Sequence, residues 1–340
     1  MLRSIRVLTA GMAAALLLGS GCSADGGDAA ADDKKPGQIE KVSFLTGFGL
    51  FGREAYIYVA KEKGYFQEAG LDVEVKSGAG TGENLKLLLA GQADYGVVDL
   101  TGALIEYGKT ELKDFTVISA INQRTVTCIM SVEGRNISKP KDLEGKKIGY
   151  QPGGVNYTLF PAYAKLAGID PSKVKWVVGS PQQLPQFLAA GTIDAQTQLV
   201  VGAPTVKNVT KKEPVVLPYS DFLTDLYGNA LAVSKKKATE NPDQVRRFNA
   251  AMLKGLEYSI DHPDEAGEIF AKFQKIQPPA VAAGEVKLFA PYVRPGGSEK
   301  IGVLDPARVA RSIAIMQGIG LIPAGVTPEQ VVTSEFLPTT

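Results

Sequence analysis

The sequence contains the same pattern twice, about one hundred residues apart, and this repeat constrains the fold more than any other feature. Each copy consists of a turn glycine, a β-branched strand, a helix and an Ala-Gly-x-x-Asp segment. In the first copy these parts are Gly70, 73–75, 85–89 and 90–94, and in the second they are Gly168, 174–178, 184–188 and 190–194. A strand–helix–strand unit leaves the carboxyl ends of its strands facing a crevice, where open α/β sheets bind ligands. Two such units predict two lobes with a cleft between them.

Composition sets broad limits on the function. The chain has 340 residues, of which 44% are hydrophobic and 21% charged, so it is long enough for two ordinary globular domains. Lys and Arg number 37 against 36 for Asp and Glu, a formal net charge of +1. There is no overall field to attract nucleic acid or an anionic membrane, and no nucleic-acid partner is expected.

The N-terminus has the pattern of a secretion signal. Arg3 and Arg6 precede an apolar run at 7–18, which is too short to span a bilayer comfortably and gives way to small residues. The segment 20–22 resembles a bacterial lipobox, although Gly19 stands where leucine is more usual. Residues 1–22 are therefore expected to be a lipoprotein signal peptide, with Cys22 acylated and holding the protein on the extracytoplasmic face of the membrane. The alternative is ordinary cleavage, with Cys22 either removed or left unmodified.

The next segment, 23–38, is made mostly of Ala, Asp, Gly and Lys and has no apolar periodicity. It cannot bury a core and is expected to be a flexible tether. A flexible chain of this length reaches on the order of 20 Å, enough to hold a domain away from a membrane surface.

Residues from 39 onward predict two lobes joined by two crossings of the chain. A polar, proline-bearing stretch at 136–145 indicates the passage into the second lobe, and the apolar run at 227–233 indicates the return. The expected division is 39–132 and 230–340 for lobe 1 and 133–229 for lobe 2, which permits a hinge. After the return, Asn241 is the expected cap of a long amphipathic helix, and further helices at 266–273, 281–289 and 306–318 are expected to wrap lobe 1.

Few residues are suited to catalysis. The body contains one cysteine, Cys128, in an apolar run that indicates a buried core thiol, and the only histidine, His262, stands beside a proline at a helix end. No Gly-x-Ser-x-Gly elbow and no cysteine or histidine ligand set is present. We expect no enzyme activity, no metal and no cofactor.

Several segments together resemble the ABC-transporter substrate-binding proteins of the sulfonate, nitrate and thiamine-pyrimidine-precursor type. They are 58–66, Glu68, 70–74, Ala90 and Gly91 with Asp94, 141–149, and Asn241 and Pro242 with 245–248. The resemblance implies an α/β, two-lobed periplasmic-binding-protein type II fold with a hinged cleft between the lobes. It also implies a monomer that captures a small organic or anionic solute and delivers it to an ABC permease. The eukaryotic pyrimidine-precursor synthases of similar fold use a histidine and a cysteine-rich segment, to which this chain has no counterpart.

Three loops are expected to face the cleft. In the first, Arg53 stands at a helix start, where the dipole disfavours a cation, so it is expected to face an anionic or polar solute or to pair with a nearby carboxylate. Phe48 and Phe51 are expected either to stack on a ring of the solute or to belong to the core. Glu54 is a further candidate contact in this loop. The second loop is a plain turn or an anion site with backbone N–H groups at a helix start; its candidate contacts are Ser77, Gly80 and Thr81.

The third loop repeats the glycine-then-helix arrangement in the second lobe. Its candidate contacts are Gly153, Gly154, Asn156 and Tyr157. Asp99 and Thr101, at the end of a strand, add hydrogen bonds to the solute or cap a helix. A sensor of the same shape that docks another protein is the alternative function, and neighbouring genes for a permease and an ATPase, or for a sensor kinase, would distinguish the two.

Overall fold

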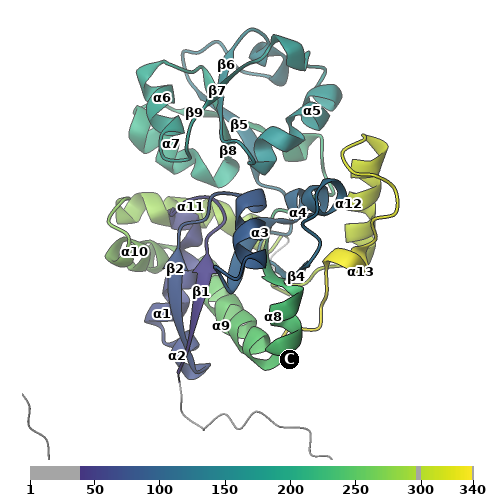
Figure 1. The fold of residues 1–340 in the computed structure, drawn as a ribbon. Helices are drawn as coiled ribbons and strands as arrows, with labels where there is room; N and C mark the ends of the chain where they lie inside the picture. Colours follow the sequence, from purple (N-terminus) through teal and green to yellow (C-terminus); the bar gives the residue numbers. More distant parts are fainter. Residues whose placement is uncertain (1–38, 296–299, 339–340) are drawn as a thin grey trace, which may run out of the picture. The chain divides into compact units, whose positions relative to one another are not determined.

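The computed structural model describes residues 39–295 and 300–338, so the predicted signal peptide, Cys22 and the tether lie outside the described residues. The described chain forms two five-stranded sheets, ordered β2-β1-β3-β10-β4 and β7-β6-β8-β5-β9 (Figure 1). The strands of the first sheet are β1 (Glu40–Leu45), β2 (Leu71–Lys76), β3 (Tyr95–Asp99), β4 (Phe115–Ala120) and β10 (Asn229–Ser234). Those of the second are β5 (Thr127–Val132), β6 (Lys147–Tyr150), β7 (Lys175–Val178), β8 (Ala195–Leu199) and β9 (Pro214–Pro218).

The sequence repeat corresponds to the same arrangement in each sheet. The strands of each copy do not pair with each other but flank a third strand: β1 lies parallel between β2 and β3, and β6 lies parallel between β7 and β8. The last aspartate of each copy binds that central strand. Asp94 accepts a hydrogen bond from the Ser43 N–H at 2.8 Å, and Asp194 accepts one from the Lys147 N–H at 2.9 Å. The repeat therefore encodes how each parallel sheet is assembled.

The strand β5 belongs to the second sheet, which corrects the predicted division of the chain. It pairs antiparallel with β8 and β9, whereas the division at 132 and 133 placed residues 127–132 in the first lobe. Its counterpart β10 returns to the first sheet and pairs antiparallel with β3 and β4. The chain thus crosses between the sheets before β5, and the polar stretch at 136–145 is a surface turn that contains a short helix, η2 (Pro140–Leu143).

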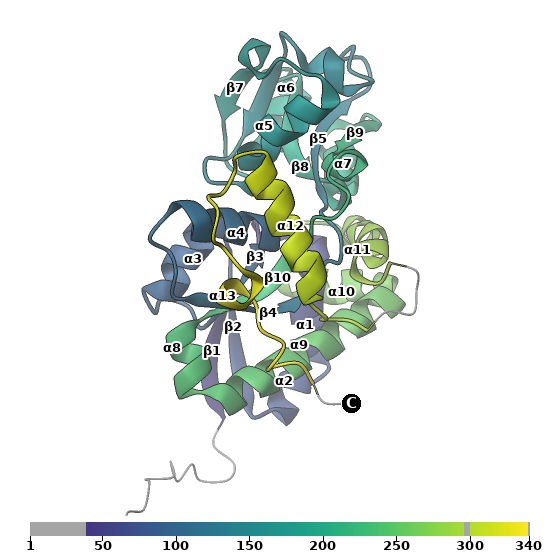
Figure 2. The ribbon, with the colours of Figure 1, turned by 90° about the vertical axis from the view of Figure 1, so that its right-hand side faces the viewer.

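The helices of the first lobe pack around long apolar stripes. The helix α9 (Pro242–Asp261) packs against α1 (Ala55–Glu62), and its Phe248 is fully buried with its ring centroid 3.6 Å from that of Tyr95. Asn241 occupies the N-cap position of α9, but its side chain makes no capping hydrogen bond. The helix α12 (Pro306–Gly318) packs against α4 (Leu100–Lys109), and Figure 2 shows the two from the side.

One C-terminal helix contacts both lobes. The helix α11 (Pro279–Val293) packs on α10 (Pro263–Phe273) in the first lobe and on α7 (Ala203–Thr210) in the second. The predicted helices after the return crossing are present, but α11 covers more than the first lobe. Within the described ranges, no helix has both the length and the apolar character needed to cross a membrane.

Candidate solute-binding site

A small cavity lies where the carboxyl ends of strands from both sheets meet. The first lobe contributes the loop after β1, the start of α3 (Thr81–Leu89) and the end of β3, and the second contributes the start of α5 (Val155–Ala167) and the end of β8. The lining residues are Gly47, Phe48, Gly80, Thr81, Asp99, Gly154, Val155, Asn156, Leu199 and Asn229. The cavity volume is about 30 Å³, the space of roughly one water molecule. A larger solute needs the walls to move apart.

The walls of the cavity touch each other across the two lobes. The side-chain amide of Gln151 donates a hydrogen bond to the carbonyl of Ala79. A Cβ atom added to Gly102 would lie 3.2 Å from Val155 Cγ2, and one added to Gly80 would lie 3.8 Å from the carbonyl oxygen of Gly153. Glycines at these points let the lobes approach closely, so the structure is a closed form.

Asp99 supplies the only carboxylate among the residues that line the cavity. Asp99 caps α4, because its Oδ1 accepts a hydrogen bond from the Gly102 N–H at 2.9 Å. The backbone N–H of Asp99 donates to the Thr81 hydroxyl at 3.0 Å. The residue is 5% exposed. Burial raises the pKa of Asp99 to about 7, and hydrogen bonds from the backbone of Gly102 and Thr101 only partly oppose this.

We expect Asp99 to make the stability of the solute-free protein depend on pH. The pKa of Asp99 in the folded protein lies above the ordinary value of 3.8, so the folded state holds the proton more tightly than the unfolded chain does. The free energy of unfolding that this tighter binding contributes is lost as pH rises through about 7. Asp99→Asn keeps a good N-cap and removes the titration. Its free energy of unfolding, relative to the wild type, should rise between about pH 4 and 8 by on the order of a few kcal/mol.

Urea denaturation at several pH values measures this difference. Asp305→Asn is the matched control, because Asp305 also caps a helix, accepting from the Ala307 N–H at 2.9 Å, but is exposed. If the free energies of unfolding of the wild type and Asp99→Asn differed by the same amount at every pH, Asp99 could not be a buried carboxyl that titrates in this range.

Arg53 does not line the cavity. Its guanidinium is 2% exposed, donates to the carbonyl of Phe48 at 3.0 Å, lies 4.3 Å from the centre of the Phe51 ring and pairs with Glu285 at 3.6 Å. Of the two interpretations of this arginine, the geometry agrees with pairing to a carboxylate. Phe51, which is buried beneath it, does not line the cavity either.

Glu285 lies at the centre of a buried polar network that joins the lobes. This α11 carboxylate accepts hydrogen bonds from the Arg53 N–H at 3.1 Å, from the Gln277 amide at 3.1 Å and from the hydroxyl of Thr205. Thr205 belongs to α7 of the second lobe, and Gln277 also accepts from the Gly52 N–H at 2.7 Å. The network thus fixes the turn η1 (Gly52–Glu54) and crosses from one lobe to the other.

Glu54 lies behind the cavity wall. Its Oε2 accepts from the Tyr56 hydroxyl at 2.9 Å, whereas its buried Oε1 has no hydrogen-bond partner. A Cβ atom on Gly47, which lines the cavity, would be 3.6 Å from this Oε1 and 3.4 Å from the amide nitrogen of Asn229. Burial raises the pKa of Glu54 although the adjacent Arg53 opposes the shift.

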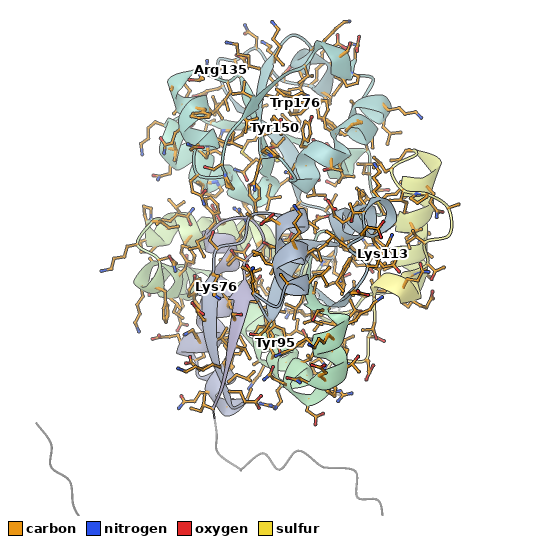
Figure 3. The ribbon with its side chains drawn as sticks, in the orientation of Figure 1. Lys76, Tyr95, Lys113, Arg135, Tyr150 and Trp176 are labelled. Carbon is orange, nitrogen blue, oxygen red and sulfur yellow. The ribbon has the colours of Figure 1, made fainter. Side chains whose placement is uncertain are left out.

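The other predicted contacts lie away from the cavity lining. Ser77 and Gly153 are exposed, and the Thr101 hydroxyl donates to the carbonyl of Tyr227 at 3.2 Å. Tyr157 stacks on Tyr150 with ring centroids 4.2 Å apart and meets Trp176 edge-on. Figure 3 labels Tyr150 and Trp176 side by side in the second lobe. Six of the predicted contacts therefore share the cavity: Phe48, Gly80, Thr81, Asp99, Gly154 and Asn156.

Four lining residues were not predicted: Gly47, Val155, Leu199 and Asn229. The repeat carried a signal for one of them. At the end of each copy the two sequences align with an offset of one hundred residues, so Leu199 at the end of β8 corresponds to Asp99 at the end of β3. The second lobe therefore presents an apolar side chain where the first presents a carboxylate.

The residues best suited to other chemistry lie elsewhere. His262 is exposed between α9 and α10, and Cys128 is fully buried in β5, where desolvation raises the pKa of its thiol. Across 39–295 and 300–338, no group of three or more His, Cys, Asp or Glu side chains is placed to hold a metal ion.

Comparison with known proteins agrees with the fold. An alkanesulfonate-binding protein of Xanthomonas axonopodis pv. citri, solved with bound MOPS, superposes with a TM-score of 0.68 at 16% identity, covering 87% of this chain and 99% of that one. The formylaminopyrimidine-binding protein of Halalkalibacterium halodurans is 25% identical over 70% of this chain and 71% of its own. A 4-amino-5-hydroxymethyl-2-methylpyrimidine phosphate synthase of Candida albicans is 24% identical over 69% of this chain and 71% of its own.

The α/β, two-lobed periplasmic-binding-protein fold is thereby confirmed, as is the resemblance drawn from the sequence. The family model described as "NMT1/THI5 like" matches residues 53–266, which include most of both sheets and all the segments that line the cavity except Gly47 and Phe48. The chain belongs to the NMT1/THI5-like family.

Proposed function

We propose that this protein is an extracytoplasmic solute-binding lipoprotein that captures a small solute between its lobes and delivers it to an ABC importer. The observation that carries the proposal is the cavity at the carboxyl ends of strands from both sheets, lined by turns from each lobe. Open α/β sheets bind ligands at this edge. The similarity to a formylaminopyrimidine-binding protein supports solute capture in the same family.

Opening and closing would take place about the two crossings. The Thr125 N–H donates to the Leu226 carbonyl at 2.8 Å, and the Asn122 N–H donates to the Asn229 carbonyl at 2.8 Å, so the crossing segments pair with each other. A paired two-segment connection lets the lobes rotate while each sheet stays intact. Solute that contacts both lobes favours the closed state, and a permease that recognises this state distinguishes loaded from empty protein.

The proposal includes no chemical step. The synthase among the relatives shows that the family is not confined to binding proteins. In this chain, however, the one histidine is exposed at the end of α9 and the body's one cysteine is buried within β5, both outside the cavity lining. A sensor that docks another protein remains the alternative, and a kinase gene in place of permease and ATPase genes beside this one would favour it.

Anchoring and import are tested together in cells that carry the full chain. Wild-type protein should sediment with membranes and incorporate palmitate label, whereas Cys22→Ser should lose both. Deleting the gene should abolish uptake of whichever solute stabilises the purified protein, and the wild-type gene should restore uptake. Unchanged uptake after deletion would refute a role in import, and a wild type that stays in the soluble fraction would refute the anchor.

A further inference from the structure

We propose that a groove on the hinge side of the molecule is a second binding site, which takes a small zwitterion with an apolar body, such as an apolar α-amino acid. The carboxylate of this ligand pairs with Arg124 and its ammonium group with Asp221. The site is separate from the cleft, so this inference goes beyond the proposed function and does not depend on which solute is imported.

The groove is formed by both lobes and by both crossings. Its walls come from η4 (Val200–Gly202) and η5 (Tyr219–Asp221) in the second lobe, from α11 and α12 in the first, and from residues 123–124 and 224–225 of the crossings. Its volume is about 830 Å³, which is typical of small-molecule sites, whereas the cavity in the cleft has about 30 Å³. A small organic molecule therefore fits in the groove without movement of the walls.

The crossings are held to the first lobe along this groove. The guanidinium of Arg308, on α12, donates to the carbonyl of Asp225 at 3.3 Å and to the carbonyl of Gln123, and it lies 4.0 Å from the centre of the Tyr227 ring. The Gln123 N–H donates to the carbonyl of Tyr292, on α11, at 2.6 Å. These hydrogen bonds fix the shape of the groove and leave other side chains to bind a ligand.

Two charged side chains of the groove are unpaired among the described residues. Arg124 and Asp221 are exposed, and neither has an ion pair or a side-chain hydrogen bond with another part of the described chain. The other charged side chains of the lining are engaged: Lys287 with Asp264, Asp225 with Arg311, and Arg308 with the carbonyls of the crossings. A free guanidinium and a free carboxylate in one groove match a ligand that carries both a carboxylate and an ammonium group.

Both free charges act on the same hydroxyl group. Tyr292 is partly buried in the groove, and desolvation raises the pKa of its hydroxyl. Cys128 and Asp221 add to this rise in the pKa of Tyr292, and Arg124 opposes it. Because a charge shifts a pKa appreciably only at short range, the guanidinium and the carboxylate lie around one end of the Tyr292 ring. A single small molecule can therefore reach both charges.

Apolar side chains line the rest of the groove. Leu288 and Pro291 are exposed on α11, and Val200 belongs to the second lobe. Leu288 is 39% exposed, which is unusual for a leucine in a helix that packs on both lobes. Covering these side chains with an apolar body is favourable. The groove thus matches both the charged end and the apolar body of such an amino acid.

The groove and the cleft share a wall. Leu199 lines the cavity in the cleft, and the next residue, Val200, lines the groove. The cavity residue Asn229 accepts a hydrogen bond at its carbonyl from the N–H of Asn122, which precedes the groove residue Gln123. Figure 2 shows α11 directly below α7 of the second lobe. A ligand that contacts both α11 and η5 joins the two lobes and favours the closed arrangement.

The test is calorimetry on the full chain with three compounds that share a phenyl ring. L-phenylalanine carries both charges, 3-phenylpropionate lacks the ammonium group and phenethylamine lacks the carboxylate. Each compound is titrated into the wild type, Arg124→Ala, Asp221→Asn and two controls. The control Arg246→Ala removes an exposed arginine of α9 outside the groove lining, and Asp99→Asn changes the cleft instead.

We expect the wild type to bind phenylalanine at least roughly tenfold more tightly than either analogue, and both groove variants to lose this advantage. Arg124→Ala should leave the affinity for phenethylamine unchanged, and Asp221→Asn the affinity for 3-phenylpropionate, because each removes the partner of a group that the compound lacks. Both controls should bind like the wild type. Hydrogen exchange in the cleft turns 78–81 and 151–154 should slow when phenylalanine binds, because the closed arrangement is favoured.

Absence of phenylalanine binding, or equal affinity for the three compounds, would overturn the proposed site. Binding that is weakened by Asp99→Asn but not by Arg124→Ala would place the compound in the cleft and overturn the assignment of the groove. Unchanged exchange in the cleft turns at saturation would overturn the coupling to closure. The import proposal is tested separately by gene deletion, so its failure and the failure of this inference are distinguishable.

Discussion

Replacing Glu285 by alanine is expected to lower the free energy of unfolding by about 3–5 kcal/mol. The carboxylate is fully buried and is the only anion within ion-pair distance of Arg53 among the described residues. Its removal deprives a buried guanidinium of its ion-pair partner and the Gln277 amide and the Thr205 hydroxyl of an acceptor. Because Thr205 belongs to the second lobe, we also expect the closed form to be less favoured.

Urea denaturation of the wild type, Glu285→Ala and Lys287→Ala measures the effect. Lys287 is the matched control on the same helix: it pairs with Asp264 at 2.7 Å, but both side chains are more than half exposed, at 53% and 77%. Exposed pairs contribute about 0–1 kcal/mol. Equal losses in the two variants would show that the Glu285 network is no stronger than a surface pair.

Much of the fold was predictable because it depends on local periodicity. Alternating and helical apolar patterns located the strands and helices, and the repeat indicated two similar sheets. The sheet to which β5 belongs was not predictable, since a continuous apolar strand such as 127–132 can be buried in either sheet. Its partners β8 and β9 follow far along the chain, and no local pattern specifies them.

The candidate site was predictable where it depends on turns that end parallel strands. Phe48, Gly80 and Gly154 follow from glycine loops between strands and helices, and Asp99 follows from its place at a strand end. The role of Arg53 was not predictable, because its partner Glu285 is 232 residues away. The helix that carries Glu285 was predicted to pack only against the first lobe. Burial and pairing of a charge are tertiary properties, and no local pattern around Arg53 specifies them.

Gly78→Ala is expected to lower the free energy of unfolding by roughly 3 kcal/mol or more and to weaken solute binding. A Cβ at this position would lie 1.7 Å from the carbonyl oxygen of Thr46 and 2.7 Å from the Asn84 amide, so the backbone must move. The Gly78 carbonyl accepts from the Gly49 N–H at 2.9 Å, and its N–H donates to the Thr46 hydroxyl at 3.0 Å. Moving Gly78 therefore moves the loop that carries Phe48.

Thermal and urea unfolding of Gly78→Ala, compared with Gly318→Ala, isolates this clash. Gly318 ends α12, and no atom lies within 4 Å of the position its Cβ would take, so alanine there should be neutral or stabilising by up to about 1 kcal/mol. If Gly78→Ala unfolded at the same urea concentration as the wild type, the loops after β1 and β2 could not be packed as closely as the structure shows. A variant that stays folded but no longer binds the solute would place the effect in the shape of the cleft, because the displaced loop carries the Phe48 ring, which lies beside both glycine turns.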